Sequence, residues 1–209
     1  MKESDNIKIG LEIHLQLDCL TKLFCSCSTD SDKPNTKLCP VCLGMPGSKP
    51  VLNKKAVELA IKLGLALNCN IQKENFFSRK TYFYPDMSKN YQITQYEYTL
   101  CLKGNLRFKN KVIRIRRIHL EEDPASIQYP GTIDNSEYCL IDYNRSGVAL
   151  CEIVTEPDLN SAEEAREFLE FLVSVIAYLD IYNSKKFTIR VDANVSLPGT
   201  KRVEIKNIT

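Results

Sequence analysis

Four cysteines near the start of the chain impose the strongest constraint on its fold. Cys25 and Cys27 form a Cys-x-Cys pair, and after an eleven-residue loop Cys39 and Cys42 form a Cys-Pro-Val-Cys pair. Two cysteine pairs separated by about a dozen residues can close around one Zn2+ ion with four thiolate ligands. Because four protein ligands leave no open coordination position, we expect a structural zinc knuckle over residues 25–42.

Two disulfide bonds are the alternative interpretation of this quartet. The N-terminus lacks the charged-then-apolar pattern of a secretion signal, and no apolar run approaches about 18 residues. We therefore expect a cytoplasmic protein without a membrane segment, in a reducing compartment that keeps thiols free. This expectation favours zinc over disulfides. The cysteines expected to be buried thiols are Cys19, Cys69, Cys101, Cys139 and Cys151.

The composition indicates a folded domain but does not identify a partner. The chain has 209 residues, 44% of them hydrophobic, which suits one domain with a core. Its 28 basic and 26 acidic residues leave a net charge of +2, so any contact with RNA must be local or shared with a partner. The chain contains no Gly-x-Gly-x-x-Gly motif and no Walker-type loop, so no glycine-rich cradle is available for a nucleotide.

The periodicity predicts two helices and several strands. Asn53 can cap a helix that runs to about Leu67, where apolar residues recur at helical spacing. Ser161 and Glu164 form a capping box for a second helix that runs to about Leu179. The other periodic segments alternate with a period of two and are separated by turn signals. The predicted class is therefore α+β, with a mostly antiparallel sheet backed by helices.

Alternating strands gather polar side chains on common faces. In the segment 11–17 the apolar residues take one face, which places Glu12 and His14 together on the other. The segment 190–196 alternates in the same way, with Arg, Asp and Asn on its polar face. One such face could be the solvent side of a sheet. Several of them, together with carboxylates embedded in apolar runs, favour a cleft.

Two carboxylates interrupt apolar runs. Between residues 112 and 123 the alternation slips at Arg116-Arg117, which indicates a β-bulge and places Glu122 on the apolar face. The segment 148–154 is apolar on both faces except for Glu152. A buried carboxylate is costly unless it meets a cation or a metal. The alternative for Glu122 is a solvated acidic turn.

Oxygen ligands and an imidazole, with arginines nearby, fit Mg2+ and phosphate chemistry. His14 and His119 are the only histidines in the chain. Neither accompanies a nucleophile motif such as Gly-x-Ser-x-Gly, which disfavours a Ser-His-Asp hydrolase.

Long runs, in order along essentially the whole chain, resemble the B subunit of the glutamyl/aspartyl-tRNA amidotransferase. These runs are GLEIH at 10–14, CPVCLG at 39–44, RKTYFYPD at 79–86, YQITQ at 91–95, HLEED at 119–123, DYNRSG at 142–147, EIVTEPD at 152–158 and DANVS at 192–196. The related E subunit of the archaeal two-subunit enzyme is similar at the first motif and the cysteines. The blocks YFYPD and YQITQ point to the B subunit.

The resemblance implies an ATP-dependent enzyme. ATP phosphorylates the side-chain carboxylate of glutamate or aspartate mis-attached to the glutamine or asparagine tRNA, and ammonia then displaces phosphate. The family fold is similar to that of glutamine synthetase and the guanidino kinases, in which carboxylates and Mg2+ replace a glycine-rich loop. We therefore expect ATP and Mg2+ as cofactors in addition to structural Zn2+.

The resemblance also implies roles for single residues. His14, Glu122 and Glu152 are the expected catalytic residues and Mg2+ ligands, with Glu12 close by as a further ligand. The residues expected to bind the nucleotide and the aminoacyl end of the tRNA are Arg145, Asp192 and Asn194. Where family members have Glu-Gly-Ser-Leu-Arg, this chain has the segment 186–190, which keeps the arginine and a small hydroxyl residue.

The implied partners are an amidase (A) subunit that supplies ammonia, a small C subunit and the mischarged tRNA, in a heterotrimer. From the resemblance we expect residues 1–209 to correspond to the N-terminal part of the kinase-like (cradle) domain, without the helical and tRNA-binding tail domains. A second polypeptide with the rest of the B subunit would pair near Val203. The alternative function is a non-catalytic, zinc-stapled assembly module that needs such a chain.

Overall fold

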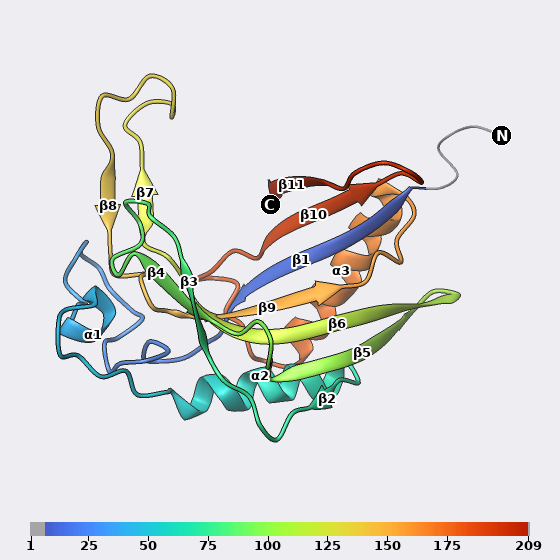
Figure 1. Cartoon of the computed structure of the whole chain (residues 1–209), viewed down its shortest axis with the longest axis horizontal. Helices are drawn as coiled ribbons and strands as arrows, with labels where there is room; N and C mark the ends of the chain where they lie inside the picture. Colours follow the sequence, from blue (N-terminus) through green and yellow to red (C-terminus); the bar gives the residue numbers. More distant parts are fainter. Residues whose placement is uncertain (1–6, 209) are drawn as a thin grey trace.

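The computed structural model describes residues 7–208, which form one central sheet with helices and short hairpins around it (Figure 1). The strands are β1 (Lys8–Gln16), β2 (Asn70–Ile71), β3 (Ser78–Thr81), β4 (Tyr91–Thr94), β5 (Cys101–Phe108), β6 (Lys111–Glu122), β7 (Ser126–Gln128), β8 (Leu140–Asp142), β9 (Ala149–Thr155), β10 (Arg190–Ser196) and β11 (Val203–Ile208). The helices are α1 (Pro40–Leu43), α2 (Lys54–Ala66) and α3 (Ala162–Tyr178).

The central sheet has seven strands in the order β11-β10-β1-β9-β6-β5-β2. All of its neighbouring pairs are antiparallel. The hairpins β3–β4 and β7–β8 are separate two-stranded sheets. The α+β class with a mostly antiparallel sheet is thus confirmed.

Both predicted helices form where their caps indicated. The Asn53 side chain accepts hydrogen bonds from the backbone N–H groups at the start of α2, and Ser161 accepts one from Glu164 N at 3.1 Å. The Glu164 carboxylate accepts from Asn160 N at 2.7 Å, one residue before the cap. Each helix ends one residue before the predicted boundary, at Ala66 and at Tyr178.

One hydrophobic cluster joins the sheet to α2 and α3. Ile13, Ile153 and Ile118 are paired in register across β1, β9 and β6, and all three are fully buried. Phe168 of α3 packs edge-to-face on Phe108 of β5, with ring centroids 5.6 Å apart. The helices therefore cover one face of the sheet, and the polar side chains are left to the other.

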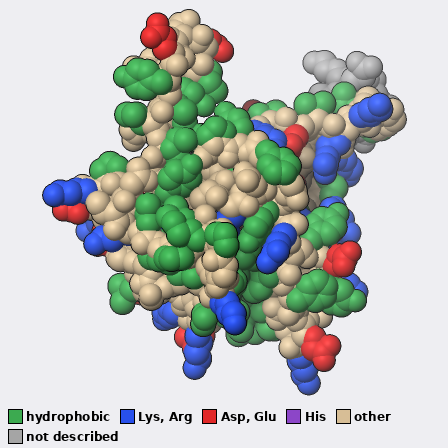
Figure 2. All heavy atoms as spheres, turned by 60° about the vertical axis from the view of Figure 1, so that its left-hand side comes forward, with side chains coloured by type: hydrophobic (Ala, Val, Ile, Leu, Met, Phe, Trp, Pro, Cys, Tyr) green, Lys and Arg blue, Asp and Glu red, His purple; other side chains and the backbone are tan. Residues whose placement is uncertain are grey.

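The β3–β4 hairpin lies on β6, and the β7–β8 hairpin projects from the body (Figure 1). Figure 2, in which this side is turned forward, shows hydrophobic side chains reaching the surface over the hairpins. Among the described residues, no helix combines the length and the apolar character needed to cross a bilayer.

Gly104 marks a close approach between β5 and the end of α2. A Cβ atom at this position would lie 2.6 Å from the Leu67 carbonyl oxygen and would overlap the Cys69 sulfur. Because backbone would have to move, we expect Gly104→Ala to lower the free energy of unfolding by about 1–3 kcal/mol in urea denaturation.

Gly131→Ala is the matched control, since its Cβ would meet only Ser136 Oγ at 3.5 Å. An equal loss of stability in both variants would show that the close approach at Gly104 is not what makes the substitution costly.

Candidate functional site

The strand register sets three polar side chains in a row on the sheet face opposite the helices. His14 of β1 lies opposite Glu152 of β9, and Glu152 lies opposite His119 of β6. His119 and Glu152 are buried despite this location, and His119 Nε2 lies 3.2 Å from a Glu152 carboxylate oxygen. Three neighbouring strands thus bring two imidazoles to one carboxylate.

The predicted β-bulge decides which acidic residue joins this row. The register between β6 and β9 shifts between Ile115 and Arg117, which confirms the bulge. Beyond it, His119 and Glu121 share the polar face, and His14 Nδ1 lies 3.4 Å from a Glu121 oxygen. Potential ligand atoms of His14, Glu121 and Glu152 all lie within 4.8 Å of one another. These three residues could hold a metal ion.

The charges of this cluster balance one another. Burial disfavours the charged form of His119. Its hydrogen bonds to Glu121 and Glu152 outweigh this effect and raise the pKa of His119 to about 9. Burial also opposes the charge on His14, but its contacts with Glu121 raise its pKa as well. In return, hydrogen bonds from both histidines outweigh burial and lower the pKa of Glu121. Contacts with the carboxylates therefore favour the protonated form of both imidazoles.

Glu122 points to the other side of β6. Its carboxylate forms a buried ion pair with the Lys89 ammonium group, whose side chain is 7% exposed. Glu122 also accepts a hydrogen bond from the Ile93 backbone N–H at 3.2 Å. The prediction that Glu122 lies on the apolar face and meets a cation agrees with this arrangement, but the cation is a lysine. The structure brings Glu121, and not Glu122, to His14 and Glu152.

Two cavities adjoin the cluster. One, of about 530 Å³, is lined by His119, Arg117 and Arg79 along with cluster residues. The other, of about 260 Å³, is lined by His14, Arg190 and further residues of the open face. We call them cavity A and cavity B. Glu121 and Glu152 line both, so the acidic cluster lies between two spaces that could take parts of a substrate.

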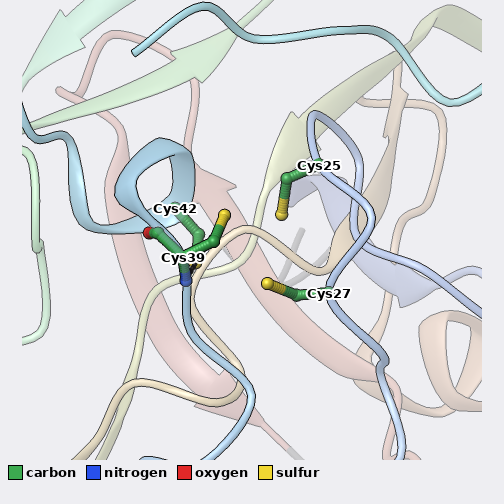
Figure 3. Close-up of side chains that lie close together, drawn as sticks. All are labelled: Cys25, Cys27, Cys39 and Cys42. Atoms are coloured by element: carbon green, nitrogen blue, oxygen red, sulfur yellow. Dashed lines mark hydrogen bonds between the residues drawn. The ribbon is translucent and has the colours of Figure 1, made fainter. Parts of the chain in front are cut away.

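The cysteine quartet forms a second cluster. The sulfur atoms of Cys25, Cys27, Cys39 and Cys42 lie within 4.8 Å of one another, and Figure 3 shows those of Cys25 and Cys27 facing the start of α1. All four thiols are free, so the structure gathers them as a quartet and not as two disulfides. This cluster could hold a metal ion.

One thiol of the quartet is readily ionised. A hydrogen bond from Cys25 and the charge of Lys22 lower the pKa of Cys42 to about 4 against the effect of burial. Lys22 is fully buried, and its Nζ lies 3.3 Å from the Tyr143 carbonyl oxygen. This buried cation favours the ionised form of Cys42.

Comparison with known proteins identifies the family. The family model described as the GatB/GatE catalytic domain matches residues 7–209. The chain belongs to this family.

Curated relatives of this family match almost the whole chain. Three are named as the B subunit of the aspartyl/glutamyl-tRNA(Asn/Gln) amidotransferase. The one from Methanospirillum hungatei is 56% identical over an alignment of 208 positions, which covers 96% of this chain and 44% of that protein. The one from Saccharolobus solfataricus is 53% identical over 211 aligned positions, with 97% of this chain and 45% of that protein covered. The one from Methanoregula boonei is 51% identical over 212 aligned positions, with 98% and 44% covered. This chain thus spans less than half the length of these relatives.

The other residues that the family resemblance singled out fall into two places. Glu12 lines cavities A and B and accepts a hydrogen bond from Asn194 Nδ2 at 3.0 Å. Asp192 lines cavity B, 3.9 Å from His14 Nε2. Arg145 instead lines a third cavity of about 500 Å³, cavity C, and donates to the carbonyl oxygens of Pro124 and Ala125.

Sequence reasoning missed several residues of the polar cluster and its surroundings. The face sorting that puts Glu122 on the apolar face also puts Glu121 and His119 together on the polar face, but it does not show that they are buried there. Lys89 and Arg190 come from distant segments, and no local pattern identifies them as partners of buried carboxylates. The structure thus adds two cationic partners and one member of the candidate metal site.

Glu122 has a stabilising role that can be measured. Glu122→Gln leaves the buried Lys89 ammonium without a charged partner, so we expect a loss of about 3–5 kcal/mol in the free energy of unfolding. Urea denaturation would measure it.

The double substitution Lys89→Met with Glu122→Leu removes both charges and serves as the control. It should recover most of the stability, because no buried charge is left unpaired. A double variant no more stable than Glu122→Gln would argue against the ion pair as the cause.

Proposed function

We propose that this chain is the catalytic lobe of a tRNA-dependent amidotransferase, which converts glutamyl-tRNA(Gln), aspartyl-tRNA(Asn) or both into the amidated forms. The observation that carries the proposal is the cluster of His14, Glu121 and Glu152 on the open face of a sheet that matches the GatB/GatE catalytic domain. The names of the relatives support the amidotransferase reaction.

The proposed reaction has two steps. A carboxylate oxygen of the misacylated amino acid attacks the γ-phosphorus of ATP, and the bond from phosphorus to the bridging oxygen breaks as ADP leaves. Ammonia then attacks the carbonyl carbon, inorganic phosphate departs with the C–O bond electrons, and a proton leaves the new amide nitrogen. The first step is needed because a carboxylate oxygen is a poor leaving group, whereas an acyl phosphate leaves readily.

The acidic cluster fits Mg2+. The ligand atoms of two carboxylates and an imidazole lie within 4.8 Å of one another, and carboxylate oxygens are ligands that Mg2+ prefers. We propose Glu121, Glu152 and His14 as ligands, with Glu12 and Asp192 close by. Glu121 thus takes the place that the sequence analysis gave to Glu122. Bound Mg2+ supplies charge neutralisation at the transferring phosphoryl group.

Other parts of the proposal follow the family. The fold is proposed to be kinase-like, similar to glutamine synthetase and the guanidino kinases. Arg145, Asp192 and Asn194 are proposed to contact the nucleotide and the aminoacyl end of the tRNA. The partners are an amidase subunit that supplies ammonia, a small C subunit and a polypeptide with the remainder of the B subunit.

The cysteine quartet is proposed to hold structural Zn2+. Four sulfur atoms within 4.8 Å suit a closed tetrahedral site, and the nearby Lys22 charge supports a set of thiolates. The loop between the two cysteine pairs lines cavity C with residues between 29 and 34. A zinc ion that holds this loop in place would therefore also maintain the shape of cavity C.

Removal of zinc should loosen the N-terminal loop. We expect the purified chain to contain one equivalent of zinc by elemental analysis, and Cys42→Ser to lose it and to unfold at a lower temperature. Cys139→Ser, outside the quartet, is the control and should keep its zinc. Zinc retained by Cys42→Ser, or a metal-free chain with disulfides by mass spectrometry, would contradict the assignment.

The metal assignment can be tested with Mn2+ as a spectroscopic probe. Glu121→Gln should weaken Mn2+ binding by about tenfold or more, because loss of an anionic ligand costs more than the ~1.4 kcal/mol that a factor of ten represents. The complex purified from its source through this chain should also lose ATP-dependent amidation of mischarged tRNA in this variant.

Two control variants make this test specific. Glu156→Gln, at a surface ion pair with Arg116, should leave Mn2+ binding and amidation unchanged. Glu122→Gln, measured where it is folded, should keep Mn2+ binding. If Glu122→Gln lost Mn2+ and Glu121→Gln kept it, the assignment made from the sequence would be the correct one. Unchanged amidation in Glu121→Gln would refute the catalytic role and favour a non-catalytic assembly module.

A further inference from the structure

Asp123 is a buried carboxylate on which side chains from distant segments converge. Its side chain is fully buried, at the end of β6. Arg190 Nη2 donates to Asp123 Oδ1 at 2.7 Å, the Gln16 amide donates to Oδ2, and Arg145 Nε lies 3.8 Å from Oδ2. A carboxylate with such partners is fixed in one position, and it fixes its partners in turn.

Arg190 has more of its donor nitrogens left for a ligand than Arg145. Arg145 already donates to the carbonyl oxygens of Pro124 and Ala125 at 2.9 and 2.6 Å. Arg190 donates to Asp123 through Nη2, and its side chain is 30% exposed, similar to the 35% of Arg145. A guanidinium group has five N–H donors in a planar fork, so Arg190 can bind an anion while it stays paired with Asp123.

The location of Arg190 connects two spaces. Arg190 lies opposite His14 in the register of β10 and β1, beside the acidic cluster. Of the described residues, it alone lines both cavity B and cavity C. Cavity C also carries Lys33, Lys186 and Arg145, against two acidic residues in its lining. An anion that extended from the acidic cluster toward cavity C would pass Arg190.

We propose that Arg190 is an anion-binding residue of the site, that it contacts a phosphate group lying between cavities B and C, and that Asp123 is the residue that positions its guanidinium. The ligand class is a polyphosphate or phosphate ester. The inference rests on the proposed function, since phosphoryl transfer at the acidic cluster needs a cation beside the phosphate oxygens that the carboxylates would otherwise repel.

A purely structural ion pair between Asp123 and Arg190 is the competing explanation. The two explanations differ in the sign of one effect. Asp123→Asn removes a negative charge next to the proposed phosphate position, so by Coulomb attraction alone it should strengthen anion binding. If Asp123 orients Arg190, the same substitution should weaken anion binding, because the guanidinium is no longer held in place.

The test is calorimetric titration of the 209-residue chain with inorganic tripolyphosphate, with divalent cations chelated. We expect Arg190→Lys to weaken binding about tenfold, since a single ammonium cannot replace a fork of donors, and Asp123→Asn to weaken it about threefold or more. Arg114→Lys, at an exposed ion pair with Asp158, is the matched control and should bind like the unmodified chain. Thermal unfolding of each variant identifies any that has lost its fold, and Arg190→Gln serves as a second variant.

Unchanged affinity in folded Arg190→Lys and Arg190→Gln, tighter binding in Asp123→Asn, or no binding by the unmodified chain at millimolar tripolyphosphate would each overturn the inference. None of these results would touch the Mn2+ titration of Glu121→Gln, so a failure here is distinct from a failure of the proposed metal site. Substituting ATP and a short single-stranded RNA for tripolyphosphate then distinguishes a nucleotide phosphate from one in an RNA backbone.

Discussion

The register between β1, β9 and β6 is the constraint on which the rest of the site depends. A slip by one residue would move the polar side chains of a strand to the helix face and its apolar side chains to the open face. The row of Ile13, Ile153 and Ile118 makes such a slip costly, because these buried side chains would leave the core. The packing that stabilises the sheet therefore also holds His14 beside Glu152.

Local patterns allowed the elements and the cysteine cluster to be predicted, because their determinants are close in sequence. The caps at Asn53 and Ser161 and the bulge in β6 depend on residues a few positions apart, and the quartet lies within residues 25–42. The choice between Glu121 and Glu122 did not follow in the same way. Burial of Glu121 on a polar face depends on β4, which packs over the end of β6 and donates through Thr94 at 3.2 Å. That contact is tertiary, and periodicity carries no trace of it.

Distance along the chain also explains why the cationic partners were missed. Arg190 follows Asp123 by more than sixty residues, and only the antiparallel order of β10, β1, β9 and β6 brings the two side chains together. An arginine on an alternating strand looks like a solvated residue until the sheet order is known. The comparison with the family motif showed that this chain keeps an arginine at position 190, but it did not explain why. The ion pair with the buried Asp123 carboxylate gives a reason.

Three consecutive buried carboxylates, Glu121, Glu122 and Asp123, are each neutralised by a different kind of cation. Glu122 has the Lys89 ammonium, and Asp123 has two guanidinium groups. Arginine stays protonated at any physiological pH, so the charge partners of Asp123 are permanent. Glu121 has two imidazoles as partners, His14 and His119, and an imidazole, unlike a guanidinium group, can give up its proton. A divalent cation can replace those protons without leaving a buried charge uncompensated, and for this reason Glu121 is the member of the acidic run best suited to metal chemistry.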